Sequence, residues 1–211
     1  MTEQIEVFTQ SSIRIRAQKG TIYIDPFQMK TKPQDANFIF ITHDHYDHYS
    51  PEDIQKVAGW KTILVVPKGL QKQAQEVAKL VSRIEVVGPG EKREINGLKI
   101  ETVPSYNLSK AYHPKKAGWV GYILTIEGKR IYIAGDTDAT KEAKAVECDI
   151  ALVPIGGTFT MDAKEAADLI NTIRPEVAIP TPYGSIVGKK EDAKTFQQKV
   201  KAPVEVEIKI P

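Results

Sequence analysis

The sequence is poor in cysteine, in long apolar runs and in excess charge of one sign. Cys148 is the only cysteine among 211 residues, which excludes an internal disulfide framework and every zinc site built from paired cysteines. No stretch approaches the roughly 18 consecutive apolar residues that a membrane-spanning helix needs. Lys and Arg number 29 and Asp and Glu number 27. The net charge of +2 therefore gives no electrostatic reason to expect a nucleic-acid or membrane-surface partner.

The composition is that of a globular protein, with 41% hydrophobic and 27% charged residues. The N-terminal segment lacks the basic stretch and apolar run that mark a signal peptide, so we expect a soluble, cytoplasmic protein. No segment rich in Pro, Gly or Ser divides the chain. We therefore expect a single domain over residues 1–211.

Apolar and alternating patterns predict two β-rich halves with helices on the outside. Strands are expected at 5–8, 12–16, 21–25, 37–42, 62–66, 83–87, 91–95, 98–103, 120–126, 129–134, 149–153, 177–179 and 204–208. Helices are expected at 50–58, 71–81, 162–173 and 191–200. The pair Glu127-Gly128 predicts a tight hairpin. The arrangement predicts a four-layer αββα sandwich of the α/β class.

Three of the four histidines lie within six positions, in the segment His43-Asp44-His45-Tyr46-Asp47-His48. Imidazole nitrogen and carboxylate oxygen are the ligands that zinc accepts when cysteine is absent. If the preceding strand continued, His43 and His45 would point the same way and could bind one ion. After a turn, Asp47 and His48 could face a second ion. A merely solvated loop is the alternative, but so many ligands after a buried strand are unfavourable unless something uses them.

A second apolar strand ends in acidic residues, in the segment Gly135-Asp136-Thr137-Asp138. Gly135 allows a sharp turn, and the Asp136 carboxylate could bridge two cations with its two oxygens. Alternatively, Asp136 or Thr137 caps a helix that begins near Ala139. The histidine cluster favours the ligand interpretation.

These segments resemble the metallo-β-lactamase superfamily. Residues 43–48 match its His-x-His-x-Asp-His signature, residues 24–27 resemble its strand-end aspartate segment, and residues 134–138 resemble its Gly-Asp-Thr motif. The resemblance implies an αββα sandwich with two metals and hydrolysis by a metal-bound hydroxide. It places His43 and His45 on the first metal, Asp47 and His48 on the second, and Asp136 on both.

Other segments are similar to a small branch of that superfamily. Residues 103–107, 113–115 and 118–122 resemble the metal-dependent hydrolases related to ascorbate-6-phosphate lactonase. Asn107 stands where the family has a third histidine for the first metal. His113, six residues later, is a candidate to replace that histidine, or it is a surface histidine before a proline. We include His113 among the expected metal ligands and expect Asn107 to contact the substrate.

The family's last metal-binding histidine precedes a Tyr-Gly pair, and here Pro182 precedes Tyr183 and Gly184. Proline offers no side-chain ligand, so the second metal would keep only Asp47, His48 and Asp136. We expect Tyr183 to line the substrate site.

The main hypothesis is a metal-dependent hydrolase of a small molecule, in which the bond is a lactone, a phosphoester or an amide. Asp47 would orient or deprotonate the attacking water. Zn²⁺ is the expected metal, as one or two ions, with Mn²⁺ or Fe²⁺ as alternatives. Lysine pairs at 115–116 and 189–190 suggest an anionic substrate. The oligomeric state is open.

Two alternatives belong to other classes. A degenerate member of the fold could bind a metal or a small ligand without turnover, as a sensor or interaction module. An oxygen-reactive iron protein could use the same fold, although such proteins usually carry a flavin domain. Tyr46 and Tyr106 could donate to a substrate oxyanion, or pack their rings against a loop.

Overall fold

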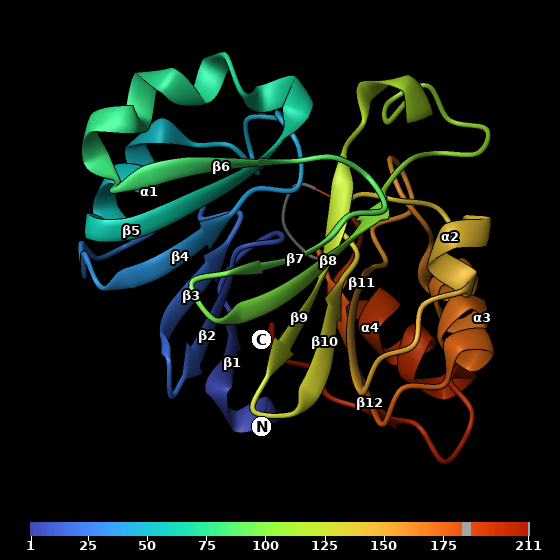
Figure 1. The fold of residues 1–211 in the computed structure, drawn as a ribbon. Coiled ribbons are helices and arrows are strands. Elements are labelled where there is room, and N and C mark those ends of the chain that lie inside the picture. The colour runs from blue at the N-terminus through green and yellow to red at the C-terminus, as the bar shows by residue number, and fades with distance from the viewer. Residues whose placement is uncertain (183–186, 211) are drawn as a thin grey trace. The chain divides into compact units, whose positions relative to one another are not determined.

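The computed structural model describes residues 1–182 and 187–210, and the chain forms two compact units, Met1–Gly88 and Pro89–Pro211. Each unit is built on its own sheet, with six strands in the first and seven in the second among the described residues (Figure 1). Helices of each unit pack on its own sheet. The predicted α/β class is therefore confirmed.

The first unit has its strands side by side in chain order, from β1 to β6. They are β1 (Ile5–Val7), β2 (Ile13–Ala17), β3 (Gly20–Ile24), β4 (Ala36–Phe40), β5 (Ala58–Pro67) and β6 (Arg83–Val87). Strands β1 to β3 are antiparallel, whereas β3 to β6 are parallel. The carboxyl ends of β3, β4 and β5 therefore meet at one edge of this sheet, which is where α/β folds place polar loops with chemical roles.

Helices of the first unit cover one face of its sheet (Figure 1). They are the 3₁₀ turn η2 (Lys68–Leu70), the α-helix α1 (Pro51–Val57) and η3 (Gln73–Leu80), whereas the 3₁₀ turn η1 (Thr2–Gln4) precedes β1 and has no buried residue. The core of this unit joins Ile39, Leu64 and Val66 of the sheet to Ile54, Val57, Ala74 and Val77 of the helices.

Two sequence predictions for these helices have different outcomes. Ser50 is the N-cap of α1, since its side chain accepts from the Asp53 amide, and Pro51 is the first helical residue, as expected. The helix expected at 71–81 is a 3₁₀ helix and not an α-helix. Its buried Ala74 and Val77 are three residues apart, a spacing that aligns side chains on one side of a 3₁₀ helix.

The second unit has the strand order β13-β12-β11-β10-β9-β8-β7. Its strands are β7 (Lys92–Ile95), β8 (Leu98–Pro104), β9 (Val120–Ile126), β10 (Lys129–Ile133), β11 (Ile150–Pro154), β12 (Val177–Thr181) and β13 (Glu205–Val206). Strands β7 to β10 are antiparallel and β10 to β13 are parallel. The final strand is shorter than the expected 204–208.

Helices of the second unit pack on one face of its sheet (Figure 1). They are α2 (Lys141–Lys144), α3 (Ala163–Ile173) and α4 (Lys190–Lys199), whereas the 3₁₀ turn η4 (Lys115–Ala117) lies in the loop between β8 and β9 and has no buried residue. Asp162 and Glu165 form a capping box that begins α3, which confirms the expected N-cap. The β9–β10 hairpin is also confirmed, because Glu127 (φ 51°) and Gly128 (φ 79°) both have the positive φ of a type I′ turn.

The helix expected near Ala139 begins later than the sequence suggested. It is α2, and Thr140 is its N-cap, accepting from the Ala143 amide. Asp136 and Thr137 therefore do not cap it, which removes the capping interpretation of these two residues.

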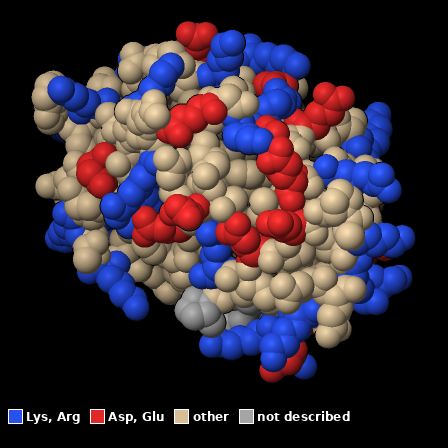
Figure 2. All heavy atoms as spheres, turned by 90° about the horizontal axis from the view of Figure 1, so that it is seen from below, with Lys and Arg blue, Asp and Glu red and all other residues tan. Residues whose placement is uncertain are grey.

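The distribution of charge on the surface and the lengths of the helices agree with the near-neutral composition and its lack of long apolar runs. Acidic and basic side chains lie interspersed on the face shown in Figure 2. Among the described residues, no helix has the length and apolar character needed to cross a membrane.

Candidate functional site

The histidine loop, residues 42–48, follows β4 at the carboxyl edge of the first sheet. The strand ends at Phe40, earlier than expected, and a tight turn follows in which the amides of His48 and Tyr49 donate to the carbonyl of His45 at 2.9 and 2.8 Å. His43 and His45 are thus in a loop and not on an extended strand, which corrects the prediction. The turn still brings His43 Nε2 to 3.1 Å from His45 Nδ1.

The other predicted ligands of this loop also converge. The ring centroids of His43 and His48 are 3.9 Å apart, and His48 Nε2 lies 3.8 Å from a carboxylate oxygen of Asp47. His43 and His48 are buried, whereas the Asp47 side chain is 18% exposed. The loop therefore gathers imidazole nitrogens at a buried point with a carboxylate beside them. Tyr46, 67% exposed, points its ring edge-to-face at Phe27 and makes no part of this cluster.

Asp25 supports the loop from the end of the adjacent parallel strand β3. Its fully buried carboxylate accepts from the amide and hydroxyl of Thr42 at 2.8 and 2.6 Å, and it lies 2.7 Å from His48 Nδ1. Burial raises the pKa of Asp25, and the contacts with His48 and Thr42 oppose that rise. A carboxylate on Nδ1 orients a histidine so that Nε2 can coordinate a metal. Nothing in the sequence indicated that Thr42 would donate to Asp25.

Asp53 of α1 holds the segment that follows Asp25. Its carboxylate accepts from the amides of Gln28 and Met29 at 2.9 Å each and from Ser50 Oγ at 2.8 Å, and pairs with Lys56 at 2.9 Å. Burial by itself raises the pKa of Asp53, but these hydrogen bonds outweigh it and lower the pKa below the usual 3.8. The sequence suggested a helix start at Ser50-Asp53 but gave no sign of this second use of Asp53.

Asp136 lies at the end of β10 in the second unit. The turn there contains Gly135, whose positive φ of 65° suits glycine. Ser105 Oγ donates to the Asp136 carbonyl at 2.8 Å, so the loop after β8 is joined to the loop after β10. His113 Nε2 lies 3.4 Å from Asp136 Oδ2, and both side chains are buried. His113 is therefore a buried partner of Asp136 and not a surface histidine.

Asn107 uses both ends of its amide inside the protein. Its Oδ1 accepts from the His113 amide at 3.0 Å and lies 3.0 Å from His113 Nδ1. Its Nδ2 donates to Asp138 Oδ1 at 3.1 Å and to the Phe159 carbonyl at 2.9 Å. The side chain is buried. A substrate contact for Asn107 stays a prediction from the sequence.

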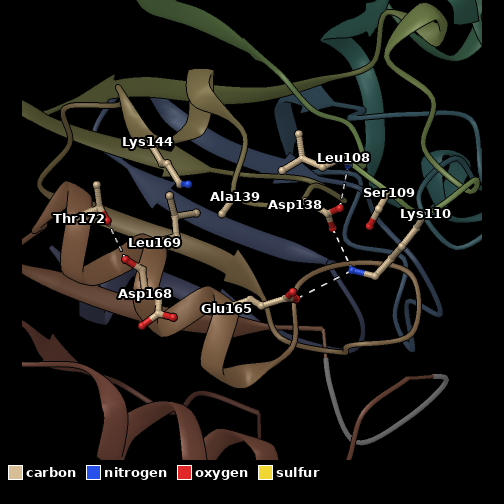
Figure 3. Close-up of a pocket in the computed structure, with 10 residues that line it drawn as sticks. All are labelled: Leu108, Ser109, Lys110, Asp138, Ala139, Lys144, Glu165, Asp168, Leu169 and Thr172. Atoms are coloured by element: carbon tan, nitrogen blue, oxygen red, sulfur yellow. Dashed lines mark hydrogen bonds and ion pairs between the residues drawn. The ribbon is translucent and has the colours of Figure 1, made fainter.

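Asp138, which accepts from Asn107 Nδ2, also lines an open hollow of about 330 Å³ beside α3 (Figure 3). Lys110 reaches across to Asp138 at 3.1 Å and also donates to the Thr160 carbonyl at 2.8 Å. Asp138 Oδ2 accepts from the Leu108 amide at 2.9 Å. The hollow is lined by both signs of charge, including Lys144, Glu165 and Asp168.

Tyr106 is held by two ionic neighbours, Glu142 of α2 and Lys115 of η4. Its hydroxyl donates to Glu142 Oε2 at 2.7 Å, and Lys115 pairs with Glu142 at 2.9 Å and lies over the Tyr106 ring. Burial alone would raise the pKa of Glu142, but the hydrogen bonds from Tyr106 and Lys115 lower it to about 2. The structure therefore favours the packing role of Tyr106 over an oxyanion contact.

The last predicted site residues lie near the end of β12. Pro182 is buried directly after the strand. Tyr183 and Gly184 lie outside the described residues.

The donors that converge in each unit fit a divalent metal. Imidazole nitrogen and carboxylate oxygen both bind Zn²⁺, Mn²⁺ and Fe²⁺, and the buried contact of Asp25 with His48 Nδ1 is the arrangement that supports a histidine ligand. In the second unit, the close approach of His113 Nε2 to Asp136 Oδ2 places two such donor atoms together.

A family model of the beta-lactamase superfamily domain matches residues 4–182 and so spans both units. The chain belongs to this superfamily. Among its curated relatives is a UPF0173 metal-dependent hydrolase of Methanopyrus kandleri. It is 32% identical over 196 residues, which cover 85% of this chain and 83% of that protein.

Solved structures confirm the metallo-β-lactamase fold that the sequence predicts. A candidate metal-dependent hydrolase from Parabacteroides distasonis matches with a TM-score of 0.82 and 28% identity, over 98% of this chain and 93% of that one. Igni18, a metallo hydrolase from Ignicoccus hospitalis, matches with a TM-score of 0.77 over 97% of this chain and 93% of its own. Its identity of 23% shows a shared fold only.

Proposed function

We propose that this beta-lactamase superfamily member is a metal-dependent hydrolase of a small molecule, and that both units serve one functional domain over residues 1–211. The observation that carries the proposal is the convergence of His43, His45 and His48 in one loop, with Asp25 behind His48. Relatives named metal-dependent hydrolases, which match over most of their length, support it.

The proposed metal ligands are imidazole and carboxylate side chains of both units, as the family resemblance implies: His43, His45, Asp47, His48, His113 and Asp136. A divalent ion held by such ligands lowers the pKa of a bound water toward about 7, which supplies a nucleophile at neutral pH. We propose Zn²⁺, as one or two ions, with Mn²⁺ and Fe²⁺ as alternatives.

Asp47 is the proposed catalytic residue. Its carboxylate is near His48 Nε2 but keeps some exposure, so it can meet both the metal ligands and a substrate water. We propose that a carboxylate oxygen of Asp47 orients the attacking water and accepts its proton. Asp47 and the proposed ion both act on the attacking water, so this role is the same whichever substrate is hydrolysed.

The scissile bond is proposed to be a lactone, a phosphoester or an amide. Of the two lysine pairs that suggested an anionic substrate, Lys115 is engaged with Glu142, so the pair at Lys189 and Lys190 carries that suggestion. The cytoplasmic location and the expected lack of nucleic-acid and membrane partners stay predictions from the composition.

The test combines metal content with turnover. We expect one or two equivalents of metal per chain, by mass spectrometry of protein purified without tags or chelators, and hydrolysis of at least one member of a panel of lactones, phosphoesters and amides. Asp47→Ala should abolish that hydrolysis and leave the circular dichroism spectrum unchanged. Asp44→Ala, an exposed carboxylate of the same loop, is the matched control and should keep turnover. Absence of metal after reconstitution would overturn the hydrolase proposal.

The second candidate function is a sensor or interaction module that binds metal without turnover. It is favoured by Pro182, which has no side-chain ligand where the family resemblance puts a histidine. One equivalent of metal, with no turnover on the whole panel and equal metal affinity for Asp47→Ala and Asp44→Ala, would support it over the hydrolase.

A further inference from the structure

Asn107 has an amide orientation that its neighbours fix completely. The Phe159 carbonyl and the Asp138 carboxylate can only accept, so the end of the amide that faces them must be the NH₂ group. The His113 backbone amide can only donate, so the end that faces it must be the oxygen. Each of these three partners allows only one orientation of the amide, and it is the same orientation for all three. The usual ambiguity between the oxygen and the nitrogen of an asparagine amide is therefore absent.

Asp138 keeps its accepting role because it is held by two donors of its own. Lys110 donates to Oδ1 and the Leu108 amide donates to Oδ2, as Figure 3 shows. The backbone at Asn107 is tied as well, since its amide donates to the His113 carbonyl at 2.8 Å. Hydrogen bonds thus hold both ends of the Asn107 side-chain amide and also its backbone amide.

His113 Nδ1 consequently faces two acceptors. Asn107 Oδ1 lies at 3.0 Å and the Phe159 carbonyl at 3.2 Å, and neither can donate. Nδ1 must therefore carry a hydrogen, and in a neutral imidazole the lone pair is then on Nε2. Nε2 is the nitrogen that lies 3.4 Å from Asp136 Oδ2.

We propose that Asn107 is a positioning residue that keeps a hydrogen on His113 Nδ1 and so leaves Nε2, the nitrogen beside the Asp136 carboxylate, as the one that can give its lone pair to a metal ion. The use of that lone pair as a metal ligand rests on the proposed function, whereas the tautomer itself does not. Asn107, at the position of the missing family histidine, thereby supports a histidine ligand supplied six residues later.

The first test is the tautomer of His113 in the metal-free, full-length protein with ¹⁵N-labelled histidine. Long-range ¹H–¹⁵N spectra distinguish the protonated nitrogen from the one with the lone pair. We expect a hydrogen on His113 Nδ1, and we expect Asn107→Leu, which removes one of the two acceptors and leaves only the Phe159 carbonyl, to raise the fraction of the tautomer with its hydrogen on Nε2. Asn107→Asp keeps Oδ1 as an acceptor for His113 but loses both hydrogen bonds of Nδ2, so a hydrogen retained on Nδ1 in this variant would assign the effect to Oδ1. An unaltered protein in which His113 Nδ1 carries no hydrogen would overturn the proposal.

The second test is metal affinity, measured by competition with a chromophoric chelator for Zn²⁺ and by the absorption of bound Co²⁺. Asn107→Leu should weaken binding by about 10- to 100-fold, as is typical when the support of a ligand is lost. Asn171→Leu is the matched control, because that amide also makes two hydrogen bonds in the same unit, to Lys199 and Lys201. It should leave both affinity and tautomer unchanged.

The outcomes separate the two proposals. A protein that binds no metal but shows the Nδ1–H tautomer would overturn the proposed function and support the role of Asn107. Equal loss of affinity in Asn107→Leu and Asn171→Leu would show a general structural effect and overturn the positioning role. If Asn107→Leu does not fold, the tautomer in the unaltered protein and in Asn107→Asp still decides the matter.

Discussion

The histidine loop of the first unit and the Asn107 cluster of the second both bring imidazole and carboxylate groups together, but they do so in different ways. The Asn107 cluster is formed by Asn107, His113, Asp136, Asp138 and Phe159. In the histidine loop, the donors are neighbours in the sequence, and one turn brings them together. In the Asn107 cluster, the members come from three separate segments, joined by hydrogen bonds.

The two regions also differ in what holds the imidazole. His48 Nδ1 meets the fully buried carboxylate of Asp25, whereas His113 Nδ1 meets two neutral oxygens. A carboxylate both orients a histidine and makes it a more basic ligand, whereas a neutral oxygen mainly orients it. The protein therefore orients one imidazole with a charged partner and another with neutral partners.

The largest expected effect tests the histidine loop itself. His43→Ala removes a buried nitrogen next to both His45 and His48, so we expect metal affinity to fall by more than about 100-fold, beyond the loss typical of a supporting residue. Equilibrium dialysis with metal analysis measures it. Asp44→Ala should bind as the unaltered protein does, and similar affinity in both variants would refute the role of the loop.

Asp25→Asn should have the next largest effect, because it keeps an acceptor for Thr42 but turns an NH₂ group toward His48 Nδ1. His48 would then carry its hydrogen on Nε2 and lose a lone pair there. We expect affinity to fall by about 10- to 100-fold. Asp35→Asn, which changes an acceptor for the Tyr23 hydroxyl elsewhere in the same unit, is the control. An unchanged affinity in Asp25→Asn would show that the charge is dispensable.

Asp53→Ala tests the support behind the loop. Removal of its carboxylate leaves the buried Met29 amide without its acceptor, which should lower the free energy of unfolding by about 1–3 kcal/mol. The lowered pKa of Asp53 means that folding favours the ionised form. The stabilisation is therefore present above the ordinary value of 3.8 and is lost as pH falls through the lower folded value.

Urea unfolding at several pH values measures this difference between the unaltered protein and Asp53→Ala. Glu52→Ala is the control, since Glu52 pairs with the same Lys56 but accepts from neither loop amide. A gap between the two proteins that widens as pH falls would contradict the sign of the pKa shift.

Tyr106→Phe should have the smallest effect. It removes one hydrogen bond to Glu142, so we expect a loss of about 1 kcal/mol in unfolding free energy, a rise in the pKa of Glu142 and unchanged turnover. Calorimetry and carboxyl NMR shifts measure the first two. If Tyr106 instead donated to an oxyanion, kcat would fall by about 100-fold or more.

Much of the fold could be predicted from the sequence, because strands and helices follow local periodicity and caps. The Glu127-Gly128 turn and the Asp162 N-cap have the predicted geometry. The two errors are also local: β4 ends before Thr42, and η3 is a 3₁₀ helix and not an α-helix. The histidine loop could be recognised for the same reason, since its ligands are contiguous.

The sequence by itself determined the contiguous ligands and the elements that carry them, because spacing and polarity along the chain express both. Only the tertiary structure decided that His113 is buried beside Asp136, that Asp53 holds the loop after β3, and that Phe159 contributes a carbonyl to His113. Phe159 lies 46 residues from His113, and its contribution is a backbone atom that every residue type possesses. A contact of that kind leaves no trace in residue identity, so no reading of the chain could have found it.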